Sequence, residues 1–192
     1  MKRLSKPGLT AIITAALVAC GGADSPDAAP AASEPATTEP AAEGAVEGGM
    51  PDWYHIDNDA RTVELHMAAQ MDGGWKFNGM ANGEGTITVP LGYEITVELT
   101  NDDSAMVHSL AIDAQVGGYG AMFEDPQPAF SGATTADPTS MTESTLPGAT
   151  ESFTFTANAA GEYALVCYVP GHAVTGMWVR FNVSEGEPGV SM

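Results

Sequence analysis

The chain has 192 residues, 44% of them hydrophobic, which suits one globular domain with appendages. It carries 25 Asp and Glu against only 6 Lys and Arg, for a formal net charge of −19. A surface this acidic repels phosphate backbones, so we expect no nucleic-acid partner. The 22 glycines and 13 prolines favour β structure with many turns.

The first twenty residues, MKRLSKPGLTAIITAALVAC, predict export. Three bases precede an apolar run from Leu9 to Ala19, which is shorter than the about 20 residues that span a bilayer. The run ends in LVAC, which resembles a bacterial lipobox, where cleavage precedes a cysteine that then receives lipid. We therefore interpret residues 1–19 as a lipoprotein signal peptide and Cys20 as the lipidation site. The alternative is an ordinary signal peptide followed by a chance cysteine.

Residues 20–50 follow as a second, compositionally distinct segment. After Cys20, Ala, Pro, Glu, Gly, Ser and Thr dominate, with no aromatic residue and no base. Such a composition buries too little apolar surface to offset the entropy of the chain. We expect a disordered acidic tether between a lipid anchor and a domain at 51–192. The protein would then be an exported, membrane-anchored lipoprotein facing the periplasm or the cell exterior.

From residue 51 onward, apolar and polar residues alternate in short runs separated by Gly, Asn and Pro, which is typical of β-strands. We expect strands at 62–67, 86–89, 94–99, 107–112, 152–156, 163–167 and 178–183. About seven short strands without a helical stretch favour an all-β sandwich. The long connection 114–150 is a functional or mobile segment by its length, and we expect Phe123 and Phe130 to pack part of it.

One loop near the end of the chain, CYVPGHAVTGM, carries three soft ligands as Cys-x4-His-x4-Met: Cys167, His172 and Met177. Thiolate, two imidazoles and a weak axial thioether form the ligand set of blue-copper electron-transfer sites. The second imidazole must come from another strand, and His108 follows a strongly alternating one. Ser109 is expected to hydrogen-bond to the ligand loop and to orient it.

Each of these residues also has an interpretation that needs no metal. Cys167 could be an inert buried thiol and Met177 a core methionine, since both types are common in cores. Met106 is a weaker rival for the axial position. Solvent-exposed roles are the expectation for His55, His66 and the Asp102–Asp103 turn, and packing is the expectation for Trp53, Trp75 and Trp178.

Three stretches together resemble sulfocyanin, a blue copper protein related to rusticyanin: WKFNGMANGEGTITVPLGYEITVELTNDDSAMVHSL, AFSGA and AGEYALVCYVPGHAVTGMW. The resemblance implies a cupredoxin-like Greek-key β-sandwich with one type 1 copper ion. By that resemblance the ligands are His108, Cys167, His172 and Met177. Archaeal sulfocyanins typically use a membrane-spanning anchor, whereas this chain carries the lipobox-like cysteine.

We therefore expect an electron-transfer protein that is not an enzyme. Electrons would pass through His172 near the surface, inside an apolar patch from Pro170 to Val174. The partners would be respiratory proteins such as a cytochrome or a terminal oxidase. The alternative is a copper storage or chaperone protein of the cell envelope. A copper enzyme is disfavoured, because it would need an open coordination position or a second copper ion with further histidine ligands, and the chain has only four histidines.

Overall fold

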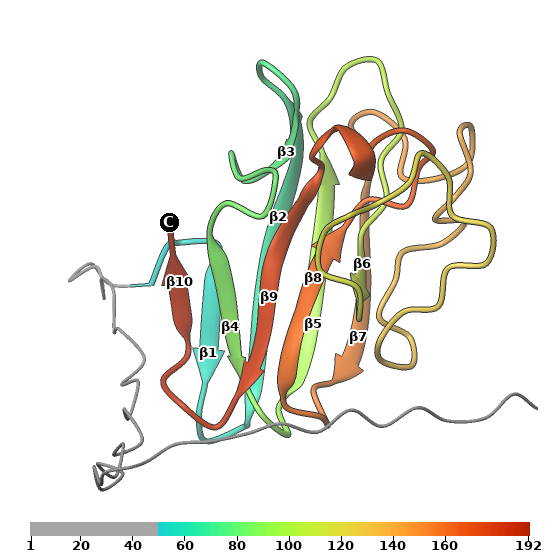
Figure 1. Ribbon diagram of the computed structural model, residues 1–192. Coiled ribbons are helices and arrows are strands. Elements are labelled where there is room, and N and C mark those ends of the chain that lie inside the picture. Colours follow the sequence, from blue (N-terminus) through green and yellow to red (C-terminus); the bar gives the residue numbers. More distant parts are fainter. Residues whose placement is uncertain (1–49) are drawn as a thin grey trace, which may run out of the picture. The chain divides into compact units, whose positions relative to one another are not determined.

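The computed structural model describes residues 50–192, which form a sandwich of two five-stranded sheets (Figure 1). One sheet has the order β1-β2-β5-β7, with β3 also paired to β2, and the other has the order β10-β4-β9-β8-β6. The strands are β1 (Tyr54–Asp57), β2 (Thr62–Met71), β3 (Trp75–Phe77), β4 (Thr86–Pro90), β5 (Glu94–Asn101), β6 (Ala111–Asp113), β7 (Thr150–Thr156), β8 (Gly161–Val166), β9 (Trp178–Ser184) and β10 (Gly189–Ser191). A 3₁₀ turn, η1 (Ala173–Thr175), lies between β8 and β9.

The all-β sandwich predicted from the alternating pattern is confirmed. β2 runs parallel to β5 and β4 runs parallel to β9, whereas the other pairs are antiparallel. Alternate residues of each strand fill the space between the sheets, as a pleated strand requires. The fully buried members of this core include Leu65, Met67, Ile87, Ile95, Leu99, Leu165 and Phe181. Complete burial of one such side chain stabilises the fold by about 1.5–3 kcal/mol.

Three strands were absent from the sequence prediction. β1 and β3 are short strands that pair with β2. β10 lies C-terminal to the last predicted strand, 178–183, and pairs with β4. The predicted strand 107–112 is wrong in extent, because only Ala111–Asp113 belongs to a strand. Within 107–110, His108 forms a single bridge to Thr145. This irregular path aims the polar side chains of residues 108 and 109 into the protein.

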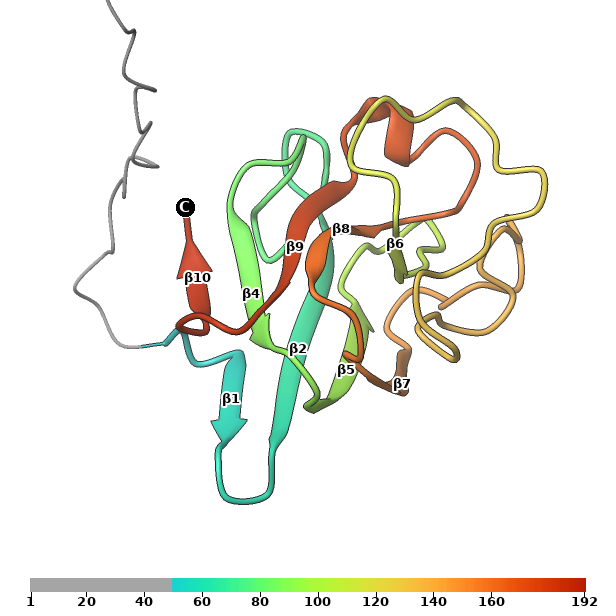
Figure 2. The ribbon, with the colours of Figure 1, turned by 60° about the horizontal axis from the view of Figure 1, so that its bottom comes forward.

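The long connection 114–150 runs along one side of the sandwich (Figure 2, yellow to orange). Phe130 is buried and stacks on Phe155 of β7 with a centroid distance of 5.1 Å. Phe123 packs on Tyr168 at 4.6 Å. Both aromatic residues therefore pack as expected, and the segment also supports the chain ahead of β6, since the amide of His108 donates to the carbonyl of Thr145.

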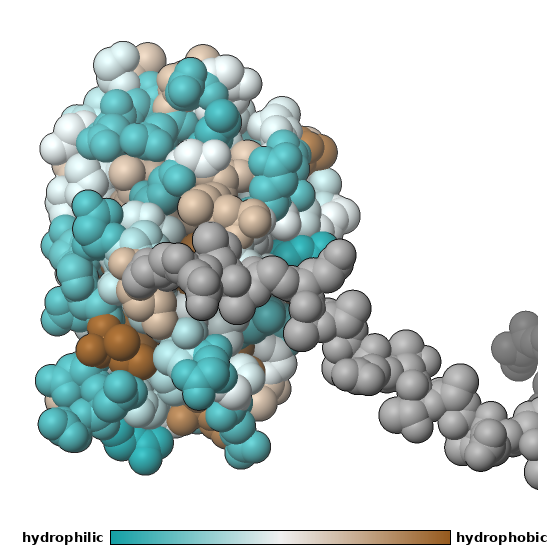
Figure 3. Space-filling view, turned by 90° about the vertical axis from the view of Figure 1, so that its left-hand side faces the viewer, coloured by the Kyte–Doolittle hydropathy of each residue, from teal (hydrophilic) through white to brown (hydrophobic). Residues whose placement is uncertain are grey.

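One face of the molecule is mainly polar. On the side of the molecule drawn in Figure 3, hydrophilic residues predominate and hydrophobic ones form only small separate groups. No helix within residues 50–192 is long and apolar enough to cross a membrane. The predicted signal peptide, Cys20 and the tether up to residue 49 lie outside the described residues.

Candidate metal centre

Cys167 directly follows strand β8 and is buried, because other residues cover both faces of this strand. Leu165 and Cys167 belong to the core between the sheets, whereas Val166 and Tyr168 face a second cluster that includes Tyr119 from the long connection. This double cover explains why the sequence around the cysteine is continuously apolar rather than alternating. The thiol is completely buried at one end of the sandwich.

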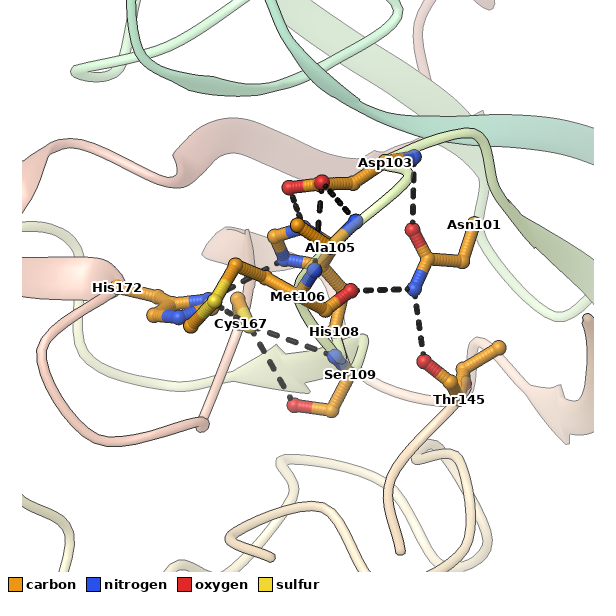
Figure 4. Close-up of polar contacts among 9 residues, drawn as sticks. All are labelled: Asn101, Asp103, Ala105, Met106, His108, Ser109, Thr145, Cys167 and His172. Carbon is orange, nitrogen blue, oxygen red and sulfur yellow. Dashed lines mark hydrogen bonds and ion pairs between the residues drawn. The ribbon is translucent and has the colours of Figure 1, made fainter. Parts of the chain in front are cut away.

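Three donor atoms meet there, from segments about 60 residues apart in the chain. Cys167, His172 and His108 each offer one atom, and these atoms all lie within 4.8 Å of one another. The Nδ1 atoms of the two imidazoles are 3.2 Å apart, and Cys167 Sγ lies 3.5 Å from His172 Nδ1 (Figure 4). Two ring nitrogens this close must share either a proton or a cation. All three side chains are at most 1% exposed.

A buried carboxylate orients the ring of His108. Nε2 of His108 lies 3.1 Å from Asp103 Oδ2, and the other oxygen of Asp103 accepts from the amides of Ala105 and Met106 (Figure 4). Burial alone would raise the pKa of the Asp103 carboxyl, but these amide and imidazole donors outweigh it and hold the pKa below its ordinary value. Because an ionised carboxylate can only accept, Nε2 of His108 carries the proton and Nδ1 turns its lone pair toward the cluster.

Asp103 is the functional residue that sequence reasoning missed. The Asp102–Asp103 pair was expected to be a solvated turn, and Asp102 is indeed exposed. Asp103, in contrast, is only 4% exposed. No pattern within the pair distinguishes the two carboxylates, since the difference arises from how the turn folds over His108.

Ser109 ties the two ligand-bearing segments together. Its hydroxyl accepts from the amide of Tyr168 at 2.9 Å, and its own amide donates to Cys167 Sγ at 3.4 Å. The hydroxyl also lies 3.6 Å from the same sulfur. These contacts place two donors beside the sulfur, which stabilises a thiolate there and fixes its position against the imidazole of the neighbouring residue His108.

Met177, immediately before β9, is completely buried. Its carbonyl accepts from the amide of Cys167 at 3.2 Å, and its amide donates to the carbonyl of His172 at 3.0 Å. Gly176 precedes it with a φ of 112°, and a Cβ at that glycine would lie 2.3 Å from Asn82 Oδ1. The tight loop therefore holds the backbone of Met177 beside Cys167 and His172. Axial ligation by the sulfur of Met177 stays a prediction.

The two remaining histidines lie away from the cluster. His66 is exposed on the outer face of β2, where its Nδ1 is 3.1 Å from Glu98 Oε1. The ring of His55 packs against it edge-on at 5.4 Å. His172 was expected to lie near the surface. Its own ring is 1% exposed, and the partly buried Trp75 of β3 stacks on it.

Burial keeps both clustered imidazoles neutral. It lowers the pKa of His108 below its ordinary value, although Asp103 opposes this effect. It lowers the pKa of His172 to about 4, with a further reduction from the neighbouring His108. Burial also raises the pKa of the Cys167 thiol, partly offset by the donors of Ser109. Without metal, the site thus holds two neutral imidazoles and a thiol, and metal binding would release the thiol proton.

Comparisons with known proteins agree on one family. A model of the sulfocyanin (SoxE) domain matches residues 52–188. Among solved structures, a methionine-to-glutamine mutant of rusticyanin superposes with a TM-score of 0.51 and 25% identity, covering 69% of this chain and 88% of that chain. Rusticyanin from Thiobacillus ferrooxidans is 27% identical over 69% of this chain and 87% of its own, with a TM-score of 0.44. No curated protein matches the chain significantly.

A β-sandwich that joins two imidazoles and one thiol at its end is a cupredoxin, the fold of blue copper proteins. Within that class, the chain belongs to the sulfocyanin family, whose domain model covers most of its length.

The donor set fits a copper ion. A thiolate suits Cu(I), imidazole suits both Cu(I) and Cu(II), and all three donors are buried with their supporting hydrogen bonds already made. A structural zinc site takes four strong ligands. Among the described residues, this cluster is the only group of at least three His, Cys, Asp or Glu side chains close enough to hold a metal.

The metal-free protein should lose stability as the pH falls from about 6.5 to 4. In this range the unfolded chain protonates its histidines while the folded protein resists protonation at His172, whose pKa is about 4. Stability is therefore full above the unfolded pKa and declines below it, by about 3 kcal/mol for this one residue. Urea unfolding at a series of pH values measures the decline. A His172→Gln variant should show a flatter profile, and an unchanged slope would contradict this assignment.

Proposed function

We propose that this protein is an electron carrier with a single type 1 copper ion held by His108, Cys167 and His172, with Met177 as the axial ligand. The observation that carries the proposal is the buried His–Cys–His cluster at the end of a cupredoxin sandwich. Copper bound there supplies a one-electron couple between Cu(II) and Cu(I). The protein holds the ligand side chains in fixed positions around the ion.

Rigid support of the ligands is what favours electron transfer over the alternative of copper storage. Asp103 fixes the tautomer of His108, and Ser109 fixes the sulfur against it. Complete burial leaves the ligand side chains no room to rearrange when the charge of the site changes. A storage or chaperone site needs ligands that release the ion readily, and this cluster is enclosed instead.

The protein's place in the cell is also a proposal. We infer that it is exported and held at a membrane by lipid on Cys20, with residues 20–50 as a tether. The support is the sequence LVAC after a basic and apolar segment. The tether would raise the effective concentration of the domain near respiratory partners such as a cytochrome or a terminal oxidase.

Copper loading should produce an intense visible thiolate-to-Cu(II) absorption band and a type 1 EPR signal, with slow release of the metal to a chelator. Cys167→Ser should abolish the band while circular dichroism still reports the β-sandwich, because only the thiolate is removed. His66→Gln, which removes an exposed histidine outside the cluster, is the matched control and should stay blue. A colourless wild-type protein that exchanges copper readily would support the storage function instead.

Replacing Asp103 with Asn should weaken copper binding by about 10- to 100-fold, since the amide no longer enforces the tautomer of His108. The control is Asp102→Asn, which removes the same charge from the exposed neighbour. Competition with a chelator of known affinity measures both variants. Equal affinities for the two would show that Asp103 contributes only charge.

Cys20→Ser should move the protein from the membrane fraction to the soluble fraction of the cell envelope, because the lipidated thiol is lost while the rest of the export signal remains. Fractionation followed by immunodetection measures this. A variant that stays with the membrane would rule out lipid on Cys20 as the anchor.

A further inference from the structure

Trp75 separates the buried ligand His172 from solvent. The two rings are stacked, with centroids 3.8 Å apart and an interplanar angle of 23°, and the indole also meets the ring of His108 edge-on at 6.2 Å. His172 is 1% exposed, whereas Trp75 is only partly buried. A path from solvent through the indole thus reaches a ligand ring without crossing a gap.

The stack, rather than a hydrogen bond, orients this indole. Trp75 begins the short strand β3 and pairs with Met71 at the end of β2. The turn between them contains Gly73 and Gly74, both with positive φ, which lets the chain reverse sharply and lay the indole over the site. Its Nε1 is buried without a partner among the residues that the structure describes. The stack on His172 is therefore the specific contact that positions the ring.

We propose that electrons enter and leave through Trp75, and that the redox partner contacts the surface at Trp75 and its strand partner Met71 rather than the ligand loop. This inference rests on the proposed function. In each transfer a reduced partner loses one electron and is oxidised, while the copper centre gains it and passes from Cu(II) to Cu(I). The indole is neither oxidised nor reduced, and no bond or proton changes there.

The surface beside Met71, the strand partner of Trp75, suits a partner with a positively charged contact face. Met71 is 62% exposed, and it lines a shallow hollow of about 290 Å³ together with residues 102–106. The exposed carboxylates beside this hollow belong to Asp72 and Asp102. An exposed apolar centre with acidic neighbours fits a brief encounter steered by charge, the usual mode of small redox interfaces.

The ligand loop offers the competing route. Val174 in η1 is 49% exposed, but the preceding His172 and Ala173 are almost fully buried. Any partner resting on Val174 would therefore meet no exposed edge of the ligand ring. The two routes place the partner on different residues, so they can be separated by experiment.

Charge substitutions test the position of the contact without altering the centre. Met71→Lys, Val174→Lys and Asn158→Lys each add one positive charge at an exposed residue, the last on the turn after β7 at the opposite end of the sandwich. Reduction of the copper-loaded full-length protein by hexaammineruthenium(II) is followed by stopped flow at the visible band. Met71→Lys should slow this cationic probe by about threefold at 0.01 M salt and lose the effect at high salt. The anionic probe hexacyanoferrate(II) should be accelerated instead.

The control at Asn158 should change neither rate by a comparable factor. A larger effect at Val174 than at Met71 overturns the inference and restores the loop as the contact. If wild-type protein is blue and exchanges electrons with both probes, the proposed function stands whichever residue responds. If it does neither, the proposed function itself fails.

Replacing the indole tests its role directly. Trp75→Phe keeps an aromatic ring over His172, whereas Trp75→Leu keeps an apolar cover without the stack. At matched reduction potential, measured for each variant by redox titration, Trp75→Leu should exchange electrons several-fold more slowly than Trp75→Phe. An equal or faster rate in Trp75→Leu would show that the indole is only a cover. The charge series remains decisive if either Trp75 variant fails to fold.

Discussion

The metal centre depends on a cross-link between distant parts of the chain, in which the amide of Ser109 donates to Cys167 Sγ and the hydroxyl of Ser109 accepts from the amide of Tyr168. These hydrogen bonds fasten the irregular segment before β6 to the loop after β8, although 58 residues separate Ser109 from Cys167. This link adds to the pairing of β6 with β8 in setting the distance from the neighbouring His108 to the thiol. The regular sheets end where the link begins, so the sandwich serves as the rigid support on which the two segments meet.

Residues around the ligands support the site by different kinds of contact. Asp103 fixes one imidazole by a charge-assisted hydrogen bond, whereas Trp75 covers the other by stacking. The long connection 114–150 contributes from a third side. It covers the outer face of β8 and accepts a hydrogen bond from the amide of His108 through Thr145. A segment that looks irregular in the sequence is thus part of the frame that holds His108 in place.

The asymmetry between the two imidazoles has a functional meaning in this arrangement. His108 is backed by a buried carboxylate and faces the interior, so it serves to anchor the site. His172 is backed by a partly exposed indole and lies closest to solvent through that ring. The two histidines thus differ in their surroundings: a carboxylate holds one, and an indole covers the other.

The sequence by itself determined the all-β class, because alternation is a local property of a chain, and it singled out His108, Cys167 and His172, which the fold brings together. Only the tertiary structure decided the roles of Asp103 and Trp75. A carboxylate in a turn is solvated or buried according to how that turn folds over its neighbours, and Asp102 and Asp103 look alike until it does. The indole likewise acquires its role from the pairing of β3 with β2, a contact that no local pattern encodes. Long-range pairing, not residue type, turned a solvated turn and a packing residue into parts of the metal centre.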